Sequence, residues 1–146
     1  MFTHIMTATD GSDYARKGLD VAIGMAKTHN AKLTILHATE LHPDYAYAGA
    51  YTAMAQAEQA LRVMQETGKE ILKGAKQLAN DAGVEAETLF AENEHPATAI
   101  DDYAQRLGCD LIVIGSRGRR GLTKLFLGSQ AAEVLAGTTI PVLIVK

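Results

Sequence analysis

The sequence predicts an α/β fold in which four helices cover a doubly wound, five-stranded parallel sheet with the strand order 3-2-1-4-5. Three observations lead to this prediction. The chain has 146 residues, the usual length of one domain. Short apolar runs alternate with long stretches of helical period. No internal repeat or low-complexity linker divides the chain, so residues 1–146 are expected to form a single domain.

The first part of the chain predicts a strand, a helix and a second strand. The apolar run from about His4 to Thr9 predicts the first strand, and Asp10-Gly11-Ser12 supplies turn and cap residues for a helix that reaches about His29. Lys32 to Thr39 predicts the second strand. Five apolar residues at helical spacing mark the inner face of the helix: Ala15, Leu19, Ala22, Ile23 and Ala26.

The middle of the chain predicts a loop, a long helix and an edge strand. Leu41 to Thr52 has no clean period and is expected to be a loop, which either folds over a bound ring or contacts a neighbouring subunit. A helical stripe from about Ala53 to Asp81 predicts a long helix that ends at Gly83. Val84 to Phe90 alternates apolar and charged residues, as expected for a strand at a sheet edge. The loop contains three tyrosines, Tyr45, Tyr47 and Tyr51.

The last part of the chain predicts two helices and two strands. His95 and Pro96 open a helix that ends at Gly108, and the uniformly apolar run Leu111 to Ile114 predicts a central strand. A connection rich in glycine and arginine follows. Ser129 to about Ala136 then predicts the last helix, and Pro141 to Val145 the last strand. In such a sheet, ligands bind beyond the carboxyl ends of the strands, where the strand order reverses.

Composition excludes several classes of protein. The formal net charge is -3, so no general attraction to nucleic acid or an anionic membrane is expected. The apolar runs are far shorter than the roughly 20 residues needed to cross a bilayer, and no export signal is visible at the amino terminus. Cys109 is the single cysteine, which excludes an internal disulfide and favours the cytoplasm.

The connection from Gly115 to Gly128 has the features of a phosphate-binding loop. Gly115 follows the buried strand, Gly118 lies three residues further on, and Gly128-Ser129 opens a helix. Glycines let backbone amides approach an anion, and a helix amino terminus adds unpaired N–H groups and a favourable dipole. The spacing is neither that of the P-loop nor that of the dinucleotide fingerprint. From the residues alone, a solvated surface turn rich in glycine and arginine remains the alternative.

Three other residues have both a functional and a structural interpretation. Asp10 either contacts a ligand or caps the turn before the first long helix. His37 and His42 could form a metal pair, but no cysteine lies nearby in sequence to complete a tetrahedral site, and a buried histidine with a backbone partner is the commoner case. Cys109 has no basic neighbour in sequence to activate it and is interpreted as structural.

The pattern Gly115-x2-Gly118-x9-Gly128-Ser129 resembles the ATP-binding motif of the universal stress protein family in full. The run GSRGRRGLTKLFLGSQAAEVL is similar to that family throughout, and the likeness extends from Thr9-Asp10-Gly11-Ser12 to the closing PVLIVK. Family members without this glycine pattern generally do not hold ATP. The resemblance therefore implies membership of the ATP-binding subgroup.

The resemblance also implies roles for individual residues. Gly118, Gly128, Ser129 and the Gln130 amide would hold phosphates, and Ile114 and Gly115 would lie nearer the ribose. Ala8 and Thr9 would border the base, and the backbone of Ala38 would read the adenine edge. Asp10 would bind the ribose or help to hold a divalent cation, Mg²⁺, beside the phosphates. Two positions depart from the common pattern, so the close phosphate and base contacts are expected to differ in detail. Arg117 stands where relatives often carry histidine, and Ala8 stands where many carry proline.

The function implied by this resemblance is ATP binding in a stress response, with occupancy read by an unidentified protein partner. The last strand leaves an apolar sheet edge, and relatives commonly associate through it, so a homodimer is expected. Two other functions stay open. One is an enzyme that slowly hydrolyses ATP or phosphorylates itself, for which the sequence offers Ser116, Thr123 and Ser129 as acceptors but no committed base. The other is a dimeric interaction module that needs no nucleotide.

Overall fold

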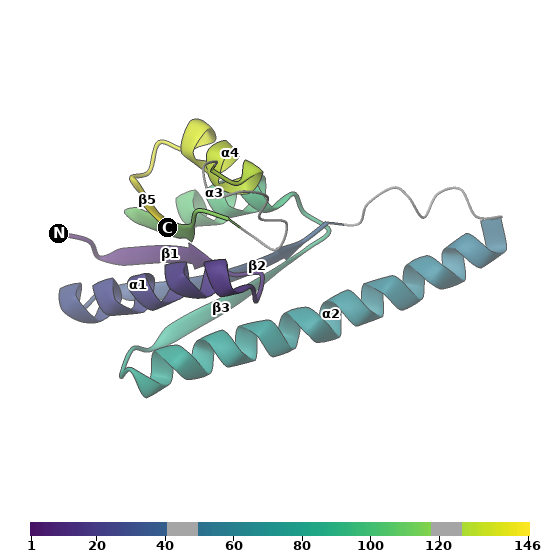
Figure 1. The fold of residues 1–146 in the computed structure, drawn as a ribbon, viewed down its shortest axis with the longest axis horizontal. Helices are drawn as coiled ribbons and strands as arrows, with labels where there is room; N and C mark the ends of the chain where they lie inside the picture. The colour runs from purple at the N-terminus through teal and green to yellow at the C-terminus, as the bar shows by residue number, and fades with distance from the viewer. Residues whose placement is uncertain (41–49, 118–126) are drawn as a thin grey trace.

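The computed structural model describes residues 1–40, 50–117 and 127–146, and within these ranges the chain forms five strands and four helices. In chain order they are β1 (His4–Ala8), α1 (Asp13–His29), β2 (Lys32–Thr39), α2 (Ala50–Asp81), β3 (Ala86–Glu92), α3 (Pro96–Arg106), β4 (Leu111–Gly115), α4 (Ser129–Gly137) and β5 (Val142–Val145). All paired strands are parallel, and their order is β3-β2-β1-β4-β5 (Figure 1). The predicted fold class and strand order are confirmed.

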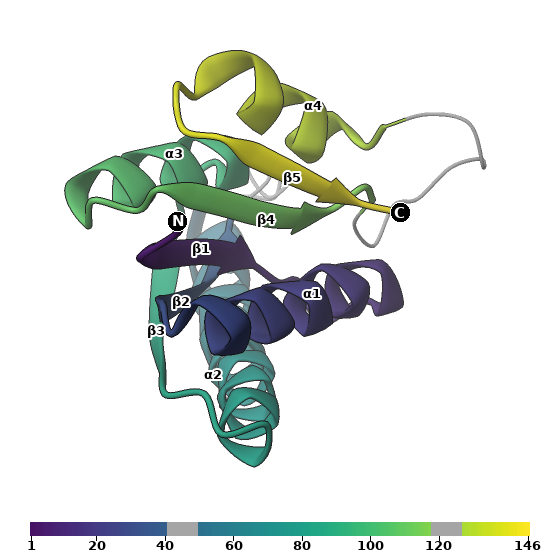
Figure 2. The same cartoon turned by 90° about the vertical axis from the view of Figure 1, so that its left-hand side faces the viewer.

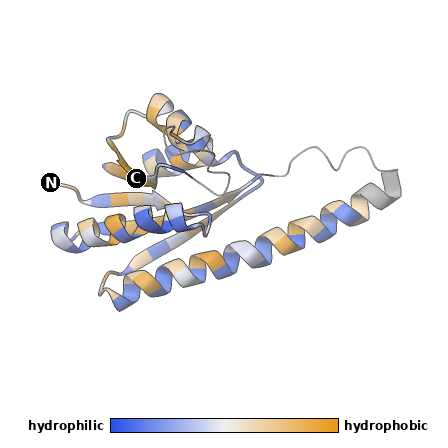
Figure 3. Ribbon diagram, viewed as in Figure 1, coloured by the Kyte–Doolittle hydropathy of each residue, from blue (hydrophilic) through white to orange (hydrophobic). Residues whose placement is uncertain are grey.

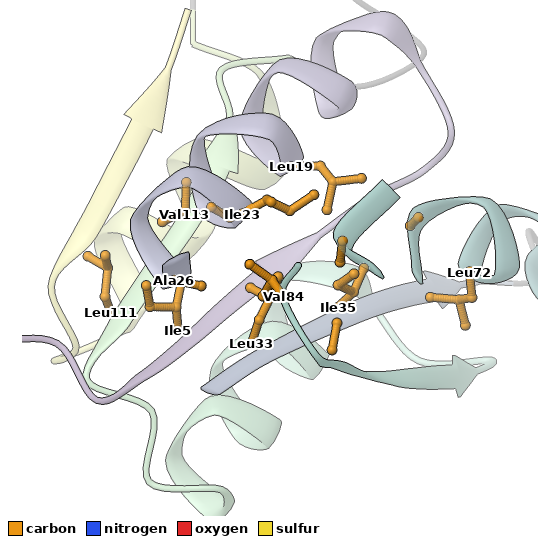
Figure 4. Packing of buried hydrophobic residues seen from close by; sticks show 14 residues of the cluster. Ile5, Leu19, Ile23, Ala26, Leu33, Ile35, Leu72, Val84, Leu111 and Val113 are labelled. Atoms are coloured by element: carbon orange, nitrogen blue, oxygen red, sulfur yellow. The ribbon is translucent and has the colours of Figure 1, made fainter. Parts of the chain in front are cut away.

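Helices cover both faces of the sheet, which is why the central strands are apolar on both sides. Figure 2 shows α1 and α2 on one face and α3 and α4 on the other. The first face buries Ile5, Leu19, Ile35 and Leu72 in one cluster, drawn in Figure 4. The opposite face buries a second cluster around the fully enclosed Ile112. Residues of β1 alternate between the two clusters, so this strand holds the layers together.

Several element boundaries differ from the prediction. Strand β4 ends at Gly115 rather than Ile114, α4 ends at Gly137 rather than about Ala136, and β5 begins at Val142 rather than Pro141. The first strand ends at Ala8 rather than Thr9. The third strand runs from Ala86 to Glu92 rather than from Val84 to Phe90, because the Val84 N–H bonds to the Ala79 carbonyl at the end of α2 and pairing with β2 continues to Glu92. Residues 50–52, predicted as loop, are the first turn of α2. Residues 41–49, with Tyr45 and Tyr47, lie outside the described residues.

Only part of helix α2 packs in the hydrophobic core. The buried residues among its described side chains all lie in the carboxyl-terminal part, which packs on β2 and β3: Gly68, Leu72, Ala75 and Ala79. The amino-terminal part extends beyond the sheet (Figure 1), where Met54 is 67% exposed, and apolar and polar residues alternate along its length (Figure 3). Within the described ranges no helix is both long enough and apolar enough to cross a membrane.

One carboxylate connects the amino ends of strands β1 and β4. Asp110, just before β4, accepts hydrogen bonds from the Thr3 N–H at 2.7 Å, the Thr3 hydroxyl at 2.8 Å and the His4 N–H at 3.0 Å. Burial raises the pKa of Asp110, but these hydrogen bonds outweigh it, and the net shift is downward. Beside it, burial and then the Asp110 charge raise the pKa of the Cys109 thiol to about 11, in agreement with a structural role for this cysteine.

We predict that Asp110→Asn destabilises the protein by about 1–3 kcal/mol near neutral pH, because an amide group replaces an oxygen that accepts bonds from N–H donors. A carboxylate whose pKa is lowered on folding stabilises the native state above its unfolded pKa of about 3.9 and ceases to do so as the pH falls through the folded pKa. Urea unfolding at neutral and acid pH should therefore show a difference between wild type and variant that shrinks on acidification.

The control for this prediction is Asp102→Asn, which changes an exposed carboxylate of α3 and should alter stability by less than about 0.5 kcal/mol. Equal effects of the two substitutions at neutral pH would contradict a fastening role for Asp110.

Candidate functional site

The candidate site lies at the carboxyl ends of β1 and β4, where the connections leave the sheet on opposite faces. The chain continues from β1 into α1 and from β4 towards α4, and these helices lie on different sides of the sheet (Figure 2). The two strands are direct neighbours, with Thr7 opposite Val113. This is the reversal point at which doubly wound sheets open a crevice for ligands. The fold therefore brings together, as the sequence predicted, the five residues at these two strand ends: Ala8, Thr9, Asp10, Ile114 and Gly115.

The turn after β1 is built by its own side chains. The Ser12 N–H donates to Asp10 Oδ1 at 2.9 Å, and the Gly11 N–H donates to Thr9 Oγ1 at 3.2 Å. Gly11 has a φ of 80°, a conformation that glycine adopts without a steric penalty. Ser12, not Asp10, caps α1 by accepting from the Ala15 N–H. The structural interpretation of Asp10 as a turn former is thus confirmed, and a contact to ribose or Mg²⁺ remains a prediction.

A buried histidine of β2 forms a hydrogen bond with the first residue of this turn. The ring of His37 is 5% exposed, and its Nδ1–H donates to the Thr9 carbonyl at 2.8 Å, which fixes that tautomer when the ring is neutral. The ring stacks on Phe90 at 5.7 Å between centroids, and Gly68 of α2 closes over both rings. The alternative partner in the metal pair, His42, lies outside the described residues, and among the described side chains no group of three or more ligands could hold a metal ion.

The amino terminus of α4 is attached directly to the end of β4. The Gly128 N–H donates to the Ser116 carbonyl at 2.7 Å, and the Ser116 N–H donates to the Val145 carbonyl at 2.7 Å. A Cβ on Gly128 would lie 3.1 Å from the Ser116 oxygen and 3.3 Å from Arg117 Cα, so glycine is needed here for close approach rather than for its φ of -61°. Gly118 lies outside the described residues.

Ser129 and Gln130 are the first two residues of α4, so their N–H groups have no partner within the helix. The Ser129 side chain is exposed beside them. The side-chain oxygen of Gln130 is already used, because it accepts from the Ala97 N–H of α3 at 3.0 Å. The backbone N–H of Gln130 and its side-chain Nε2 are therefore the groups that could donate to a ligand. The helix dipole adds partial positive charge at this end, which favours an anion.

The remaining predicted residues border this edge in different ways. Ile114 is 5% exposed with its side chain in the core, so only its backbone can contribute to a site. Ala8 pairs with Leu36 of β2. Ala38 lies two residues further along β2, half-buried, and pairs with Ala91 of β3. Ala38 thus lies on the strand next to β1, on the side away from β4.

Two features near the site were not predicted from the sequence. The Arg117 guanidinium lies over the Tyr14 ring, 5.3 Å from its centroid, and Arg117 Nε is buried with no hydrogen-bond partner among the described residues. A set of hydrogen bonds also joins His95, at the start of α3, to Glu40 and Glu133. Both features connect residues far apart in the chain and leave no local pattern in the sequence.

Comparison with known proteins gives a consistent result. A model described as the universal stress protein family matches residues 1–146. Universal stress protein YxiE of Bacillus subtilis (strain 168) is 38% identical over 149 residues, which cover 100% of each chain. Among solved structures, universal stress protein UspA from Lactobacillus plantarum is 25% identical with a TM-score of 0.83, covering 99% of this chain and 97% of that one. A universal stress protein solved in complex with cAMP is 28% identical with a TM-score of 0.68, covering 99% and 96%.

Proposed function

This chain belongs to the universal stress protein family. From that premise we propose that it binds an adenine nucleotide, ATP, at the carboxyl ends of the strands of its sheet. One observation carries the proposal: the Gly128 N–H bonds to the Ser116 carbonyl, and this contact presents the amino terminus of α4 directly beside the end of β4. A relative of known structure holds cAMP, which supports an adenine nucleotide as the ligand class. The complete glycine motif supports ATP as the particular nucleotide.

In this proposal the phosphates bind to backbone amides. The N–H groups of Ser129 and Gln130, the Ser129 hydroxyl and Gly118 hold them, and Gly128 lines the site without donating, because its N–H bonds to the Ser116 carbonyl. The ribose lies near Gly115 and Ile114, and the base lies beside Ala8, Thr9 and Ala38. Asp10 binds the ribose or helps to hold Mg²⁺. The residues fit such a ligand, because the helix terminus supplies unpaired donors and Gly128 lets that terminus lie close to the backbone of Ser116 and Arg117.

We propose that nucleotide occupancy alters a surface that a partner reads during stress, and that one such surface is shared by two copies of the chain in the cytoplasm. Strand β5 lies at the sheet edge, and its outward Leu143 is 36% exposed. Pairing of two such edges would satisfy their backbone groups. Light scattering at micromolar concentration should give twice the mass of the chain. A monomer at every accessible concentration would rule out this assembly.

Slow ATP hydrolysis or self-phosphorylation is the alternative function. Ser116 is a poor acceptor, because it is only 7% exposed, whereas Ser129 is exposed at the helix terminus. Release of inorganic phosphate, or a mass increase on Ser129 after incubation with ATP and Mg²⁺, would favour the enzyme. Unchanged ATP bound to unmodified protein would favour the binding function.

The proposal is tested by purifying the protein without added nucleotide, denaturing it and identifying any released nucleotide by chromatography. ATP with Mg²⁺ is then titrated into wild type and the Gly118→Ala, Gly128→Ala double variant. We expect affinity to fall at least about tenfold in the double variant, equivalent to about 1.4 kcal/mol. Gly74→Ala is the matched control, because Gly74 is exposed on α2 with no atom within 4 Å of an added Cβ. If wild type binds no adenine nucleotide, the nucleotide-independent module becomes the better description.

A further inference from the structure

The imidazole of His95 lies between two carboxylates that come from different parts of the fold. Its Nδ1 is 3.0 Å from Glu40 Oε2, and its Nε2 is 2.6 Å from Glu133 Oε2. His95 is the N-cap residue of α3, Glu40 directly follows β2, and Glu133 belongs to α4. A neutral imidazole has only one N–H donor, and a carboxylate can only accept. Both contacts are therefore hydrogen bonds only when the ring carries its proton.

These contacts join the two sides of the proposed nucleotide site. Glu40 follows the strand that ends with Ala38 and Thr39, on the side of the base. Glu133 lies about one helical turn after Ser129, on the side of the phosphates. Two neighbouring hydrogen bonds reinforce the connection: the Glu94 N–H donates to the Thr39 carbonyl at 2.9 Å, and the Ala97 N–H donates to Gln130 Oε1 at 3.0 Å. The start of α3 thus holds both β2 and α4.

The charges around the ring favour its protonated form. The hydrogen bond to Glu133 first, and then the one to Glu40, raise the pKa of His95, while burial opposes them. The carboxylate of the adjacent Glu94 instead accepts from the Tyr103 hydroxyl at 3.3 Å. The side chain of His95 is 37% exposed, so solvent weakens these interactions, and salt is expected to reduce the shift.

We infer that His95 is a positioning residue of the nucleotide site: its protonated ring holds the end of β2 and the first turns of α4 together, and nucleotide affinity falls when the ring loses its proton. This inference rests on the proposed function. Two effects have the same sign. The neutral ring must break one contact, which loosens α4 from β2. The loss of one positive charge also leaves Glu133 uncompensated on the helix whose amino terminus binds the phosphates.

The test has a binding arm and a spectroscopic arm. ATP with Mg²⁺ is titrated calorimetrically between about pH 6 and pH 9, a range that spans the ordinary histidine pKa of about 6.5 and values above it. The variant His95→Asn removes the titrating ring and keeps a residue suited to an N-cap. Wild type should lose about fivefold more affinity than His95→Asn across this range, at the low end of typical coupling between sites. Titration of the nucleotide itself is common to both proteins and cancels in this comparison.

The spectroscopic arm measures the pKa of His95 by NMR in the protein with and without ATP. By linkage, bound nucleotide should raise this pKa further, and Glu133→Gln should bring it down towards the ordinary value. His29→Asn is the control, because His29 lies in the last turn of α1 against Phe2 and should leave the pH profile unchanged. Parallel affinity profiles in wild type and His95→Asn, with nucleotide bound by both, would overturn this inference and leave the proposed function intact. No binding at any pH would overturn both.

Discussion

Replacing Gly18 with alanine is expected to destabilise the protein by about 2–4 kcal/mol, more than its small change in volume suggests. A Cβ at this position would lie 2.6 Å from the Gly115 nitrogen and 3.1 Å from the Ile114 carbonyl carbon. These are backbone atoms of a central strand, which cannot turn aside as a side chain would. Helix α1 would have to move away from β4 and open the core around Leu19 and Ile23.

The same helix supplies the control for this prediction. Gly24 is exposed, and no atom lies within 4 Å of a Cβ added there. Gly24→Ala should stabilise the protein by about 0.5–1 kcal/mol, because alanine loses less backbone entropy in a helix. Urea unfolding of the two variants should therefore give effects of opposite sign. Two stabilising substitutions would show that α1 does not approach β4 as closely as the geometry requires.

Gly18→Ala should also affect the site. The displaced Gly115 nitrogen belongs to the end of β4, and a Cβ on Gly115 itself would lie 2.5 Å from the Tyr14 carbonyl oxygen. The close approach of Gly18 to Gly115 therefore sets the position of the carboxyl end of β4, beside which the ribose is proposed to lie. A folded Gly18→Ala protein is expected to bind ATP more weakly than Gly24→Ala.

Replacing Ser129 with glutamate is expected to change stability and nucleotide affinity in opposite directions. Ser129 is exposed in the first turn of α4, where a negative charge interacts favourably with the helix dipole, so stability should rise by about 0.3–1 kcal/mol. The same charge would lie where the phosphates are proposed to bind. Affinity for ATP should fall about ten- to a hundredfold through charge repulsion and loss of the hydroxyl donor.

Ser129→Gln separates these effects, because it has the size of glutamate without its charge. It should lower affinity less than Ser129→Glu and leave stability nearly unchanged. Thermal unfolding and calorimetric titration of the three proteins provide both measurements. If Ser129→Glu and wild type bind ATP equally, the phosphates do not lie at the start of α4, whatever else the protein binds.

The fold class could be predicted from the amino-acid sequence, because each element of this protein is specified locally. Apolar runs indicate the strands, and Ser12 and Pro96 indicate where two helices start. The charged, solvent-exposed face of β3 indicates that this strand lies at an edge of the sheet. The neighbouring carboxyl ends of β1 and β4 follow from the strand order, so the place of the candidate site could be proposed from the sequence. The glycine spacing around Gly115 and Gly128 then indicated a phosphate ligand.

How these elements pack against one another depends on contacts between residues distant in the chain. No local pattern predicts that Gly18 must meet Gly115, that Asp110 fastens Thr3, or that His95 joins Glu40 to Glu133, since each contact connects residues far apart in the chain. The shift of β3 to Ala86–Glu92 has the same origin, because pairing with β2 decides where that strand begins and ends. Periodicity and capping act over a few residues, whereas close packing and shared hydrogen bonds exist only once distant segments meet.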